Sequence, residues 1–280
     1  MTLNTDANII LMIGGFFSEN GFASQLLEYD LSSQRWKEFM VNHVEKYATT
    51  KRLKLYGHST VYHSNSNTFY IYGGMSYLDD TKLQMSSKLF SLHYPTKKLA
   101  LVAIYSNKPY PGHYSSLIPS NGSPASYPRM FHSSVTSDKH MIIVGGKYNG
   151  KNDDNVLNEP YASLYVYRCN MWINLYIPPT PGGAKNIDPT FAGSSSIDNK
   201  GNIFVLGGIS QQYGVAKGEL SKITLPKDSC SLYASLQDVQ VCKTTLGCAH
   251  CSVSDGEGAN STFCYSNDLE KVLFYISNLN

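Results

Sequence analysis

Charged side chains are scarce in this sequence: they make up 16% of its 280 residues, and their signs nearly cancel to a net charge of +2. Long surface helices need more Glu, Lys and Ala than this composition offers, which disfavours a helical fold. The chain also lacks a basic run that would follow a nucleic-acid backbone and an acidic tail that would attract cations. We therefore expect no nucleic-acid partner.

Long hydrophobic runs are missing too. No apolar stretch reaches the roughly 18 residues of a membrane-spanning helix, so we expect no membrane span in this chain. Met1 to Asn8 is polar, and the run that follows, Ile9 to Ile13, is too short for a signal peptide. Two interpretations stay open: the chain is a fragment of a longer secreted protein, or it is cytoplasmic.

The motifs of common active sites are absent as well. The histidines show no metal-ligand spacing such as His-Glu-x-x-His, and there is neither a serine nucleophile elbow nor a phosphate-binding glycine loop. Asp79-Asp80 and Asp153-Asp154 are adjacent pairs, whose side chains would diverge on a strand. We expect no catalytic residue, no metal and no cofactor, and we predict that the chain is not an enzyme.

What the sequence does contain is tyrosine, glycine and a repeat. Its 21 tyrosines and 22 glycines are typical of many short strands joined by tight turns. An apolar strand that ends in two glycines recurs along the chain, at Gly14-Gly15, Gly73-Gly74, Gly145-Gly146 and Gly207-Gly208. Glycine pairs at strand ends permit positive φ and a close approach of neighbouring sheets, so the recurrence predicts a series of similar β-sheets.

Further shared residues surround the glycine pairs. A His-Ser strand precedes two of the pairs, with an arginine shortly before it, and a tryptophan strand follows two of them. These residues are Arg52, His58, Arg129 and His132 before the pairs, and Trp36 and Trp172 after them. In the second repeat Leu99 stands where the tryptophan would fall.

This order of elements resembles the kelch repeat. The resemblance implies an all-β fold, a kelch-type β-propeller over residues 1-228 with four recognisable blades at about 9-45, 52-102, 127-177 and 189-226. Kelch propellers usually close with about six or seven blades, so we expect this one to be incomplete. We interpret Tyr29, Tyr167 and the two tryptophans as packing groups between blades, and the two histidines as carriers of a structural hydrogen bond repeated from blade to blade.

The cysteines gather near the C-terminus. Five of the six are Cys230, Cys242, Cys248, Cys251 and Cys264. A Cys-x-x-Cys pair fits half a zinc site, a redox pair or a disulfide framework. A second pair at zinc spacing and a thioredoxin-like βαβ setting are both missing, so we favour disulfides. Cys169 is either a lone buried thiol or the partner that makes the number even.

The spacing of Cys248-Ala249-His250-Cys251 resembles the plexin-semaphorin-integrin (PSI) domain, with His250 in place of that family's tryptophan. The resemblance implies a small disulfide-rich, PSI-like module and tail over residues 229-280. A kelch array followed by such a module resembles the attractin family of extracellular and membrane-anchored proteins, whose corresponding parts lie outside the cell and act in recognition. Asn260 and Asn121 begin glycosylation sequons, which fit a glycoprotein in that setting.

We therefore predict a non-catalytic protein-recognition scaffold, part of an extracellular or cell-surface protein, that binds a protein partner through its propeller loops. The candidate loops are the Tyr- and Pro-rich Ala103 to Ser126 and the polar Lys147 to Glu159, for which a solvated linker is the alternative interpretation. An intracellular kelch adaptor with free thiols is the alternative function. A propeller oxidoreductase, which bound copper would reveal, is the third.

Overall fold

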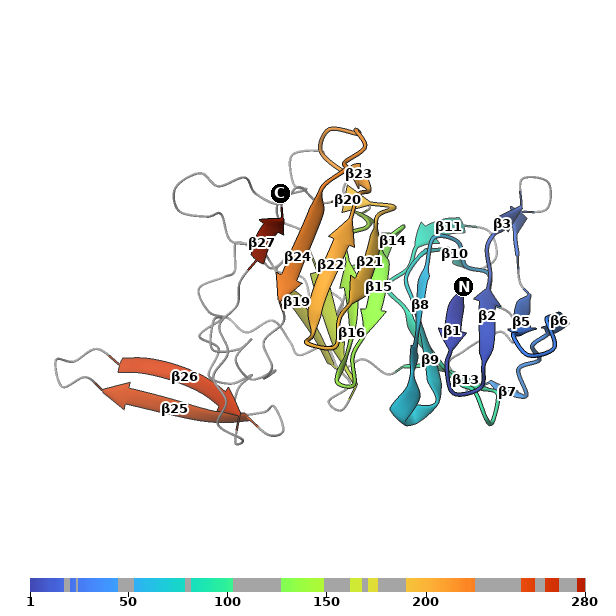
Figure 1. The fold of residues 1–280 in the computed structure, drawn as a ribbon, viewed down its shortest axis with the longest axis horizontal. Coiled ribbons are helices and arrows are strands. Elements are labelled where there is room, and N and C mark those ends of the chain that lie inside the picture. Colours follow the sequence, from blue (N-terminus) through green and yellow to red (C-terminus); the bar gives the residue numbers. More distant parts are fainter. Residues whose placement is uncertain are drawn as a thin grey trace. The chain divides into compact units, whose positions relative to one another are not determined.

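The computed structural model is an all-β protein (Figure 1). It describes residues 1–17, 21–23, 25–44, 53–78, 82–102, 127–148, 162–167, 171–175, 190–224, 248–254, 260–266 and 276–279. Among these residues the one helical element is the short 3-10 helix η1 (Ser64–Ser66). The chain divides into two compact units: Met1–Ser196 with Leu206–Gly218 form the first, and Ile197–Val205 with Glu219–Asn280 form the second.

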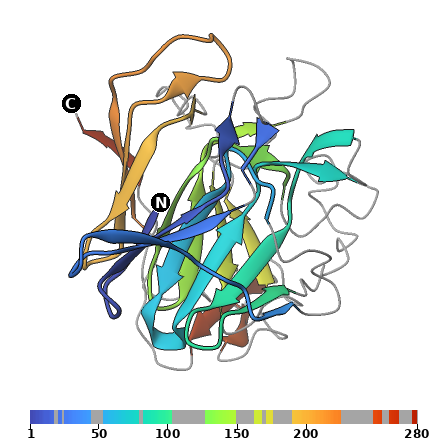
Figure 2. The ribbon, with the colours of Figure 1, turned by 90° about the vertical axis from the view of Figure 1, so that its right-hand side faces the viewer.

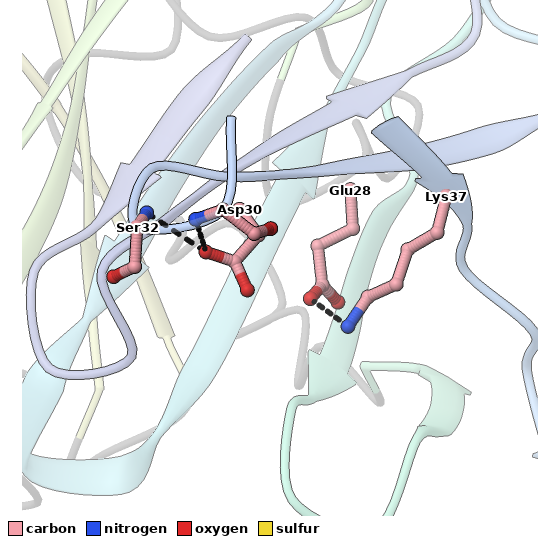
Figure 3. Close-up of polar contacts among 5 residues, drawn as sticks. Glu28, Asp30, Ser32 and Lys37 are labelled. Atoms are coloured by element: carbon pink, nitrogen blue, oxygen red, sulfur yellow. Dashed lines mark hydrogen bonds and ion pairs between the residues drawn. The ribbon is translucent and has the colours of Figure 1, made fainter. Parts of the chain in front are cut away.

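The first sheet has four antiparallel strands in the order β1-β2-β5-β6. They are β1 (Thr2–Asn4), β2 (Ile9–Ile13), β5 (Leu26–Asp30) and β6 (Arg35–Glu38). Asp30 Oδ1 accepts the backbone N–H of Ser32 at 2.8 Å and so holds the turn between β5 and β6 (Figure 3). In the same view, Lys37 Nζ lies 2.8 Å from a carboxylate oxygen of the buried Glu28.

β1 lies outside the range at which we expected the first repeat to begin. It pairs with β2 from Thr2 opposite Leu11 to Asn4 opposite Ile9. Edge pairing needs only backbone N–H and C=O groups, so a strand can form there without the His-Ser motif. Asn4 Oδ1 accepts the N–H groups of Asp6 and Ala7, both at 3.0 Å, which closes the turn into β2.

The second sheet has five strands in the order β7-β13-β12-β9-β8. They are β7 (His43–Val44), β8 (Ser59–His63), β9 (Thr68–Tyr72), β12 (Leu89–His93) and β13 (Lys98–Leu101). All pairs are antiparallel except β13 with β7, which is parallel. β7 falls within the range 9-45 that we assigned to the first blade, yet it covers the open edge of this sheet.

The third sheet repeats the four-stranded pattern in the order β15-β16-β18-β19. Its strands are β15 (Ser133–Thr136), β16 (His140–Val144), β18 (Ala162–Val166) and β19 (Met171–Leu175). Every residue of β16 is buried, so this strand is covered on both faces.

The fourth sheet has the order β21-β22-β24-β27. Its strands are β21 (Ser194–Ile197), β22 (Asn202–Leu206), β24 (Leu220–Thr224) and β27 (Ile276–Leu279). β24 and β27, both in the second unit, pair from Leu220 opposite Leu279 to Ile223 opposite Ile276. The outermost strand of this sheet thus comes from residues far beyond the range 189-226 that we assigned to the fourth blade.

Short two-stranded sheets complete the described fold. They are β3 (Phe16–Phe17) with β4 (Gly21–Phe22), β10 (Met75–Leu78) with β11 (Lys82–Met85), β14 (Arg129–Met130) with β17 (Lys147–Tyr148), β20 (Thr190–Phe191) with β23 (Ile209–Ser210), and β25 (Cys248–Ser254) with β26 (Asn260–Ser266). Four of these strands, β3, β10, β17 and β23, begin directly after a glycine pair. In the first unit, β3, β10, β11, β14 and β20 therefore gather at one end of the larger sheets, toward the top of Figure 1.

Two buried clusters join the first three sheets. Ile9, Leu11 and Ile13 of the first sheet pack with residues of the second, among them Phe69 and Leu99. Residues from the opposite face of the second sheet pack with the third in the other cluster: Val61, Tyr72, Leu89, Met141, Ile143, Tyr165 and Trp172. The second sheet is therefore buried on both faces, between the first and the third.

Equivalent residues can be matched through the strand register. In each of these sheets one residue from each of four strands lies side by side across the sheet. We call these sets cross-strand rows: Leu3-Ile10-Tyr29-Trp36, Tyr62-Phe69-Leu92-Leu99 and Thr136-Met141-Tyr165-Trp172. Leu99 thus occupies the tryptophan position, at the place where the sequence pattern put it.

Candidate recognition surface

The glycine pairs have a conformation that other residues rarely adopt. All eight glycines have positive φ, between 59° at Gly14 and 126° at Gly15. A Cβ atom on the first glycine of a pair would clash with a backbone carbonyl of the next repeat: it would lie 2.5 Å from Leu55 O at Gly14, 2.7 Å from Arg129 O at Gly73 and 2.2 Å from Thr190 O at Gly145. These positions therefore need glycine both for backbone conformation and for space.

In the first three pairs, the second glycine makes a hydrogen bond between repeats. Its N–H donates to the same carbonyl that crowds the first glycine: Gly15 to Leu55, Gly74 to Arg129 and Gly146 to Thr190, each at 2.8 Å. The first glycine permits the close approach, and the second turns it into a hydrogen bond. Each of these three pairs is thus a joint from one sheet to the next.

A second series of hydrogen bonds lies two residues beyond these carbonyls. Gly57, Phe131 and Ala192 occupy equivalent positions and all have positive φ, at 67°, 55° and 57°. Phe131 N–H donates to Gly57 O, and Ala192 N–H donates to Phe131 O, both at 2.7 Å. Consecutive repeats are thereby linked through residues in the left-handed region.

The two repeat histidines fill the space beside the glycines. A Cβ on Gly73 would lie 2.8 Å from His132 Cε1, and a Cβ on Gly146 would lie 2.7 Å from His132 Cβ. Among the described residues, three buried nitrogens of these rings have no hydrogen-bond partner: Nδ1 and Nε2 of His132, and Nδ1 of His58. The repeated hydrogen bond that we expected here stays a prediction, and the feature that the structure shows at these rings is their close packing against the glycines.

Burial keeps these imidazoles neutral. Desolvation lowers the pKa of His58 to about 4, with a smaller contribution from the positive charge of the N-terminus. Desolvation also lowers the pKa of His132 well below its usual value, with the Arg129 guanidinium as the next cause. A neutral, buried histidine in each of two repeats fits packing better than acid–base chemistry.

Arg129 is fully buried and ties its strand to the third sheet. Its Nη1 donates to Gly145 O at 3.0 Å, its Nη2 donates to Ser163 Oγ at 2.8 Å, and its guanidinium carbon lies 4.7 Å from the centre of the Tyr148 ring. The equivalent residue of the second repeat is Leu55, so Arg52, which lies outside the described residues, is not its counterpart.

Aromatic rings from successive repeats meet beside these joints. The Phe16 and Tyr56 ring centres are 5.4 Å apart, and Tyr56 meets Phe131 edge-on at 5.1 Å. In the following repeat the Lys147 ammonium lies 5.8 Å from the centre of the Phe191 ring. We call Phe16, Tyr56, Phe131 and Phe191 the aromatic strip. Phe16 is 54% exposed, and the other three are half-buried.

The strip has the properties of a recognition surface. Tyr56, Phe131 and Phe191 lie next to or at the left-handed residues, so the inter-repeat hydrogen bonds hold them in place, and little side-chain entropy is lost on binding. Aromatic rings offer large contact area with few rotatable bonds. The sequence contained a signal for the strip, because Phe16 follows a glycine pair and Phe131 precedes the His-Ser strand. Their proximity arises only in the folded protein.

The two tryptophans have different surroundings. Trp172 is 8% exposed and packs on Tyr72 of the second sheet, with ring centres 4.8 Å apart. Trp36 is 50% exposed and contacts Tyr29 of its own sheet at 4.9 Å. The ring centre of Tyr167 lies 4.7 Å from that of Tyr70 in the second sheet, and its hydroxyl oxygen lies 2.8 Å from Oγ1 of Thr136. In the described structure Trp172 and Tyr167 therefore contact rings of the neighbouring sheet, whereas Trp36 contacts a ring of its own sheet.

The cysteine-rich segment contains the β25–β26 ladder. Its register places Cys264 opposite His250, Cys251 opposite Phe263 and Cys248 opposite Ser266. Successive residues of a strand alternate between faces, so positions 248 and 264 share one face and 251 lies on the other. Cys230, Cys242 and Cys169 lie outside the described residues, and the disulfide assignment stays a prediction.

The other predicted sites are only partly described. Asn260 is the first residue of β26, whereas Asn121 and the whole of 103–126 lie outside the described residues. Of the loop from Lys147 to Glu159, the structure describes the first two residues, which form β17. In the described part of the chain, three metal-ligating side chains never gather in one place. Nor does any helix there have the length and hydrophobicity to cross a membrane.

Comparison with known proteins agrees with this architecture. The family model described as the Attractin/LZTR1 beta-propeller matches residues 1–215. Proteins named Multiple epidermal growth factor-like domains protein 8 are similar over 86% of this chain: those of Mus musculus and Rattus norvegicus are each 30% identical over 250 residues, and that of Homo sapiens is 26% identical over 286 residues. The chain spans only 7% of the mouse and rat proteins and 9% of the human one.

Proposed function

The chain belongs to the Attractin/LZTR1 β-propeller family, and from this membership we propose that it is a non-catalytic scaffold for protein recognition, part of an extracellular or cell-surface protein similar to attractin. An all-β propeller with relatives of this kind fits a protein-interaction scaffold.

The aromatic strip is the observation that carries the proposal. It lies where the short strands after the glycine pairs gather, at one end of the sheets (Figure 1). Phe16 is more than half exposed although its ring already contacts Tyr56, so it offers a rigid aromatic surface to a partner. Binding energy in protein interfaces concentrates on such pre-positioned aromatic anchors.

The role of the strip can be tested by measuring how strongly a tetramerised form of the full chain binds to intact cells. We expect the double variant Phe16→Ala/Tyr56→Ala to bind roughly tenfold more weakly than the unmodified chain, because it loses two aromatic anchors. Met40→Ala is the matched control, since Met40 is 59% exposed and lies outside the strip. Equal binding of the double variant and the control would remove the strip from the binding surface.

The finer assignment is a kelch-type propeller over residues 1-228 followed by a PSI-like module over 229-280. The positive φ of all four glycine pairs and the inter-sheet hydrogen bonds of the first three pairs support the repeat. The two-stranded ladder that carries Cys248, Cys251 and Cys264 supports a small cysteine-rich module. Disulfides in this module and glycosylation at Asn260 and Asn121 belong to the same proposal.

The extracellular assignment competes with an intracellular adaptor that has free thiols. Disulfides persist in oxidising compartments and are rare in the cytosol. We expect a thiol titration of the denatured, non-reduced chain, purified from its natural source, to find most of the six cysteines oxidised. Five or six free thiols would overturn the PSI-like module and the extracellular setting together. Stoichiometric copper in the same material would favour the oxidoreductase.

A further inference from the structure

Each glycine joint of the first unit has an exposed lysine beside it. Lys54 directly precedes Leu55, whose carbonyl accepts the N–H of Gly15. Lys88 uses its own backbone carbonyl to accept the N–H of Gly73 at 3.2 Å. Both lysines therefore lie at the end of the sheets where the short strands gather. In Figure 2, turned by 90° from Figure 1, the hairpin of β10 and β11 again stands at this upper end.

The third joint has Lys147 beside it, directly after Gly146. The Lys147 ammonium lies 5.8 Å from the centre of the Phe191 ring, which belongs to the aromatic strip. At the fourth glycine pair the half-buried Lys217 continues the series, because its N–H donates to Gly208 O at 2.8 Å. We call the three exposed residues the joint lysines: Lys54, Lys88 and Lys147. They are far apart in the sequence, and folding brings them to one end of the sheets.

The described carboxylates of the first unit lie elsewhere. Three of them are at or in the turns at the opposite end of the strands: Asp6, Asp30 and Asp138. Glu28 is buried and paired with Lys37, and Glu38 ends β6, the outer strand of the first sheet. Asp79 and Asp80, which follow β10 in the sequence, lie outside the described residues. In the described part of the chain, no carboxylate oxygen lies within 4 Å of a joint lysine, so their positive charges add to one local field.

The arrangement of the joint lysines limits the shape of the anion that they can bind. Each lysine stands at a different joint, so the three cannot converge on one small anion. Rings of the aromatic strip lie between them, with Tyr56 two residues after Lys54 and Phe191 beside Lys147. Separated cations with aromatic faces between them match a long anion whose charged groups are separated by apolar faces. A sulfated polysaccharide has this pattern, because the faces of its sugar rings lie between the sulfate groups.

We propose that the joint lysines bind a sulfated polysaccharide that runs along the glycine end of the sheets. Such a polyanion would release counterions on binding, as nucleic acids do, so its affinity should fall steeply with salt. The choice of a polysaccharide over a nucleic acid rests on the proposed extracellular setting, whereas the lysine arrangement does not. Polysaccharide binding needs no protein partner, so it adds a second ligand to the proposed recognition scaffold.

Binding of the purified full chain to immobilised heparin over a salt series tests the proposal. We expect the triple variant Lys54→Gln/Lys88→Gln/Lys147→Gln to bind roughly tenfold more weakly than the unmodified chain, with a shallower dependence on salt, because three ion contacts are lost. The glutamines keep every backbone group of the joints, and the replaced side chains are exposed.

The matched control is the triple variant Arg35→Gln/Lys97→Gln/Lys139→Gln. These residues also come one from each of the first three sheets, but they stand at the turns of the opposite end. Both triple variants lose the same net charge, so a difference between them reports on position. We expect the control to keep the heparin affinity of the unmodified chain within about twofold.

Three outcomes would overturn the proposal. They are an unmodified chain that does not bind heparin at low salt, equal weakening in both triple variants, and equal affinity for a single-stranded DNA of the same charge. The last would show a surface for any polyanion. The aromatic strip is judged separately, on cells treated with heparinase, where Phe16→Ala/Tyr56→Ala should still bind more weakly than Met40→Ala. Failure of one proposal therefore leaves the other standing.

Discussion

Gly73 shows at the scale of one residue why the repeat depends on glycine. It has a φ of 69°, its missing side chain leaves room for Arg129 O and His132 Cε1, and its neighbour Gly74 makes the hydrogen bond to the next sheet. A side chain at this position would push apart the second and third sheets at their joint.

Replacing Gly73 should therefore cost more than backbone strain alone. We expect Gly73→Ala to lower the free energy of unfolding by about 3 kcal/mol. This loss adds the cost of a left-handed backbone conformation for alanine to the cost of an overpacked contact with the next sheet. Gly201→Ala is the matched control: Gly201 has a φ of 82° but no atom within 4 Å of its would-be Cβ, so about 1 kcal/mol is expected. Urea denaturation measures the free energy of unfolding of both variants. An equal decrease for Gly73→Ala and Gly201→Ala would contradict the steric role of the joint.

The buried histidines predict sensitivity to acid. Burial lowers the pKa of His140 to about 4, with a smaller effect of Lys139, so the folded chain resists protonation that the unfolded chain accepts near pH 6.5. The resulting stability is present above about pH 6.5 and is lost as the pH falls toward 4. His58 behaves in the same way.

His140→Gln should flatten this pH dependence. We expect the loss of unfolding free energy between pH 6.5 and 4 to shrink by on the order of 3 kcal/mol relative to the unmodified chain. Chemical denaturation at a series of pH values gives the slope, and measurements above pH 7 separate it from the constant effect of the substitution. An unchanged slope would show that His140 is protonated as readily in the folded chain as in the unfolded one.

At the scale of elements, β27 has the largest consequence, because it completes a sheet from a distant part of the sequence. Its pairing with β24 satisfies backbone groups that would otherwise form an open edge. The sheet therefore depends on the residues at 276–279, which we had grouped with the tail of the cysteine-rich module.

Removing residues 276–280 should expose β24. We expect the amide protons of Leu220–Thr224 that face β27 to exchange faster, whereas those of His140–Val144 in the third sheet should keep their protection. Deleting Asn280 alone is the control for loss of the terminal residue. Unchanged exchange in β24 would mean that β27 contributes no protection to the sheet.

At the scale of the whole molecule, five of the six cysteines follow the last glycine pair, whereas Cys169 lies in the sequence between β18 and β19 of the third sheet. The described strands of these sheets contain no cysteine, whereas β25 and β26 contain three. A disulfide framework made by the five C-terminal cysteines alone, with Cys169 a free thiol, should therefore stabilise the segment around β25 and β26 and leave the first three sheets unaffected.

Reduction tests this separation. With the proposed disulfides present, a reducing agent should destabilise the segment around β25 and β26 by about 2 to 5 kcal/mol. Hydrogen exchange of β9 and β16, followed in the same experiment, should not change. Loss of protection in β9 and β16 would instead tie the sheets to the cysteines, and no change anywhere would point to free thiols.

Some of the site could be anticipated from the sequence and some could not. The glycine pairs and the tryptophan position, including Leu99 as its substitute, follow from local patterns that repeat. The contact between Phe16 and Tyr56 and that between Tyr56 and Phe131 do not, because each joins residues of different repeats. The strands β1 and β27 were also missed, since both pair through backbone groups that leave little trace in a sequence.

The sequence alone determined that this is a repeated β protein and where its glycine joints lie, because positive φ and strand periodicity depend on the residues themselves. Only the tertiary structure decided which of two equivalent tryptophans is buried. Trp36 and Trp172 occupy matching positions in matching strands, yet one is 50% and the other 8% exposed. Burial depends on what lies opposite a residue: the second sheet lies opposite Trp172, and among the described residues no sheet covers the row of Trp36.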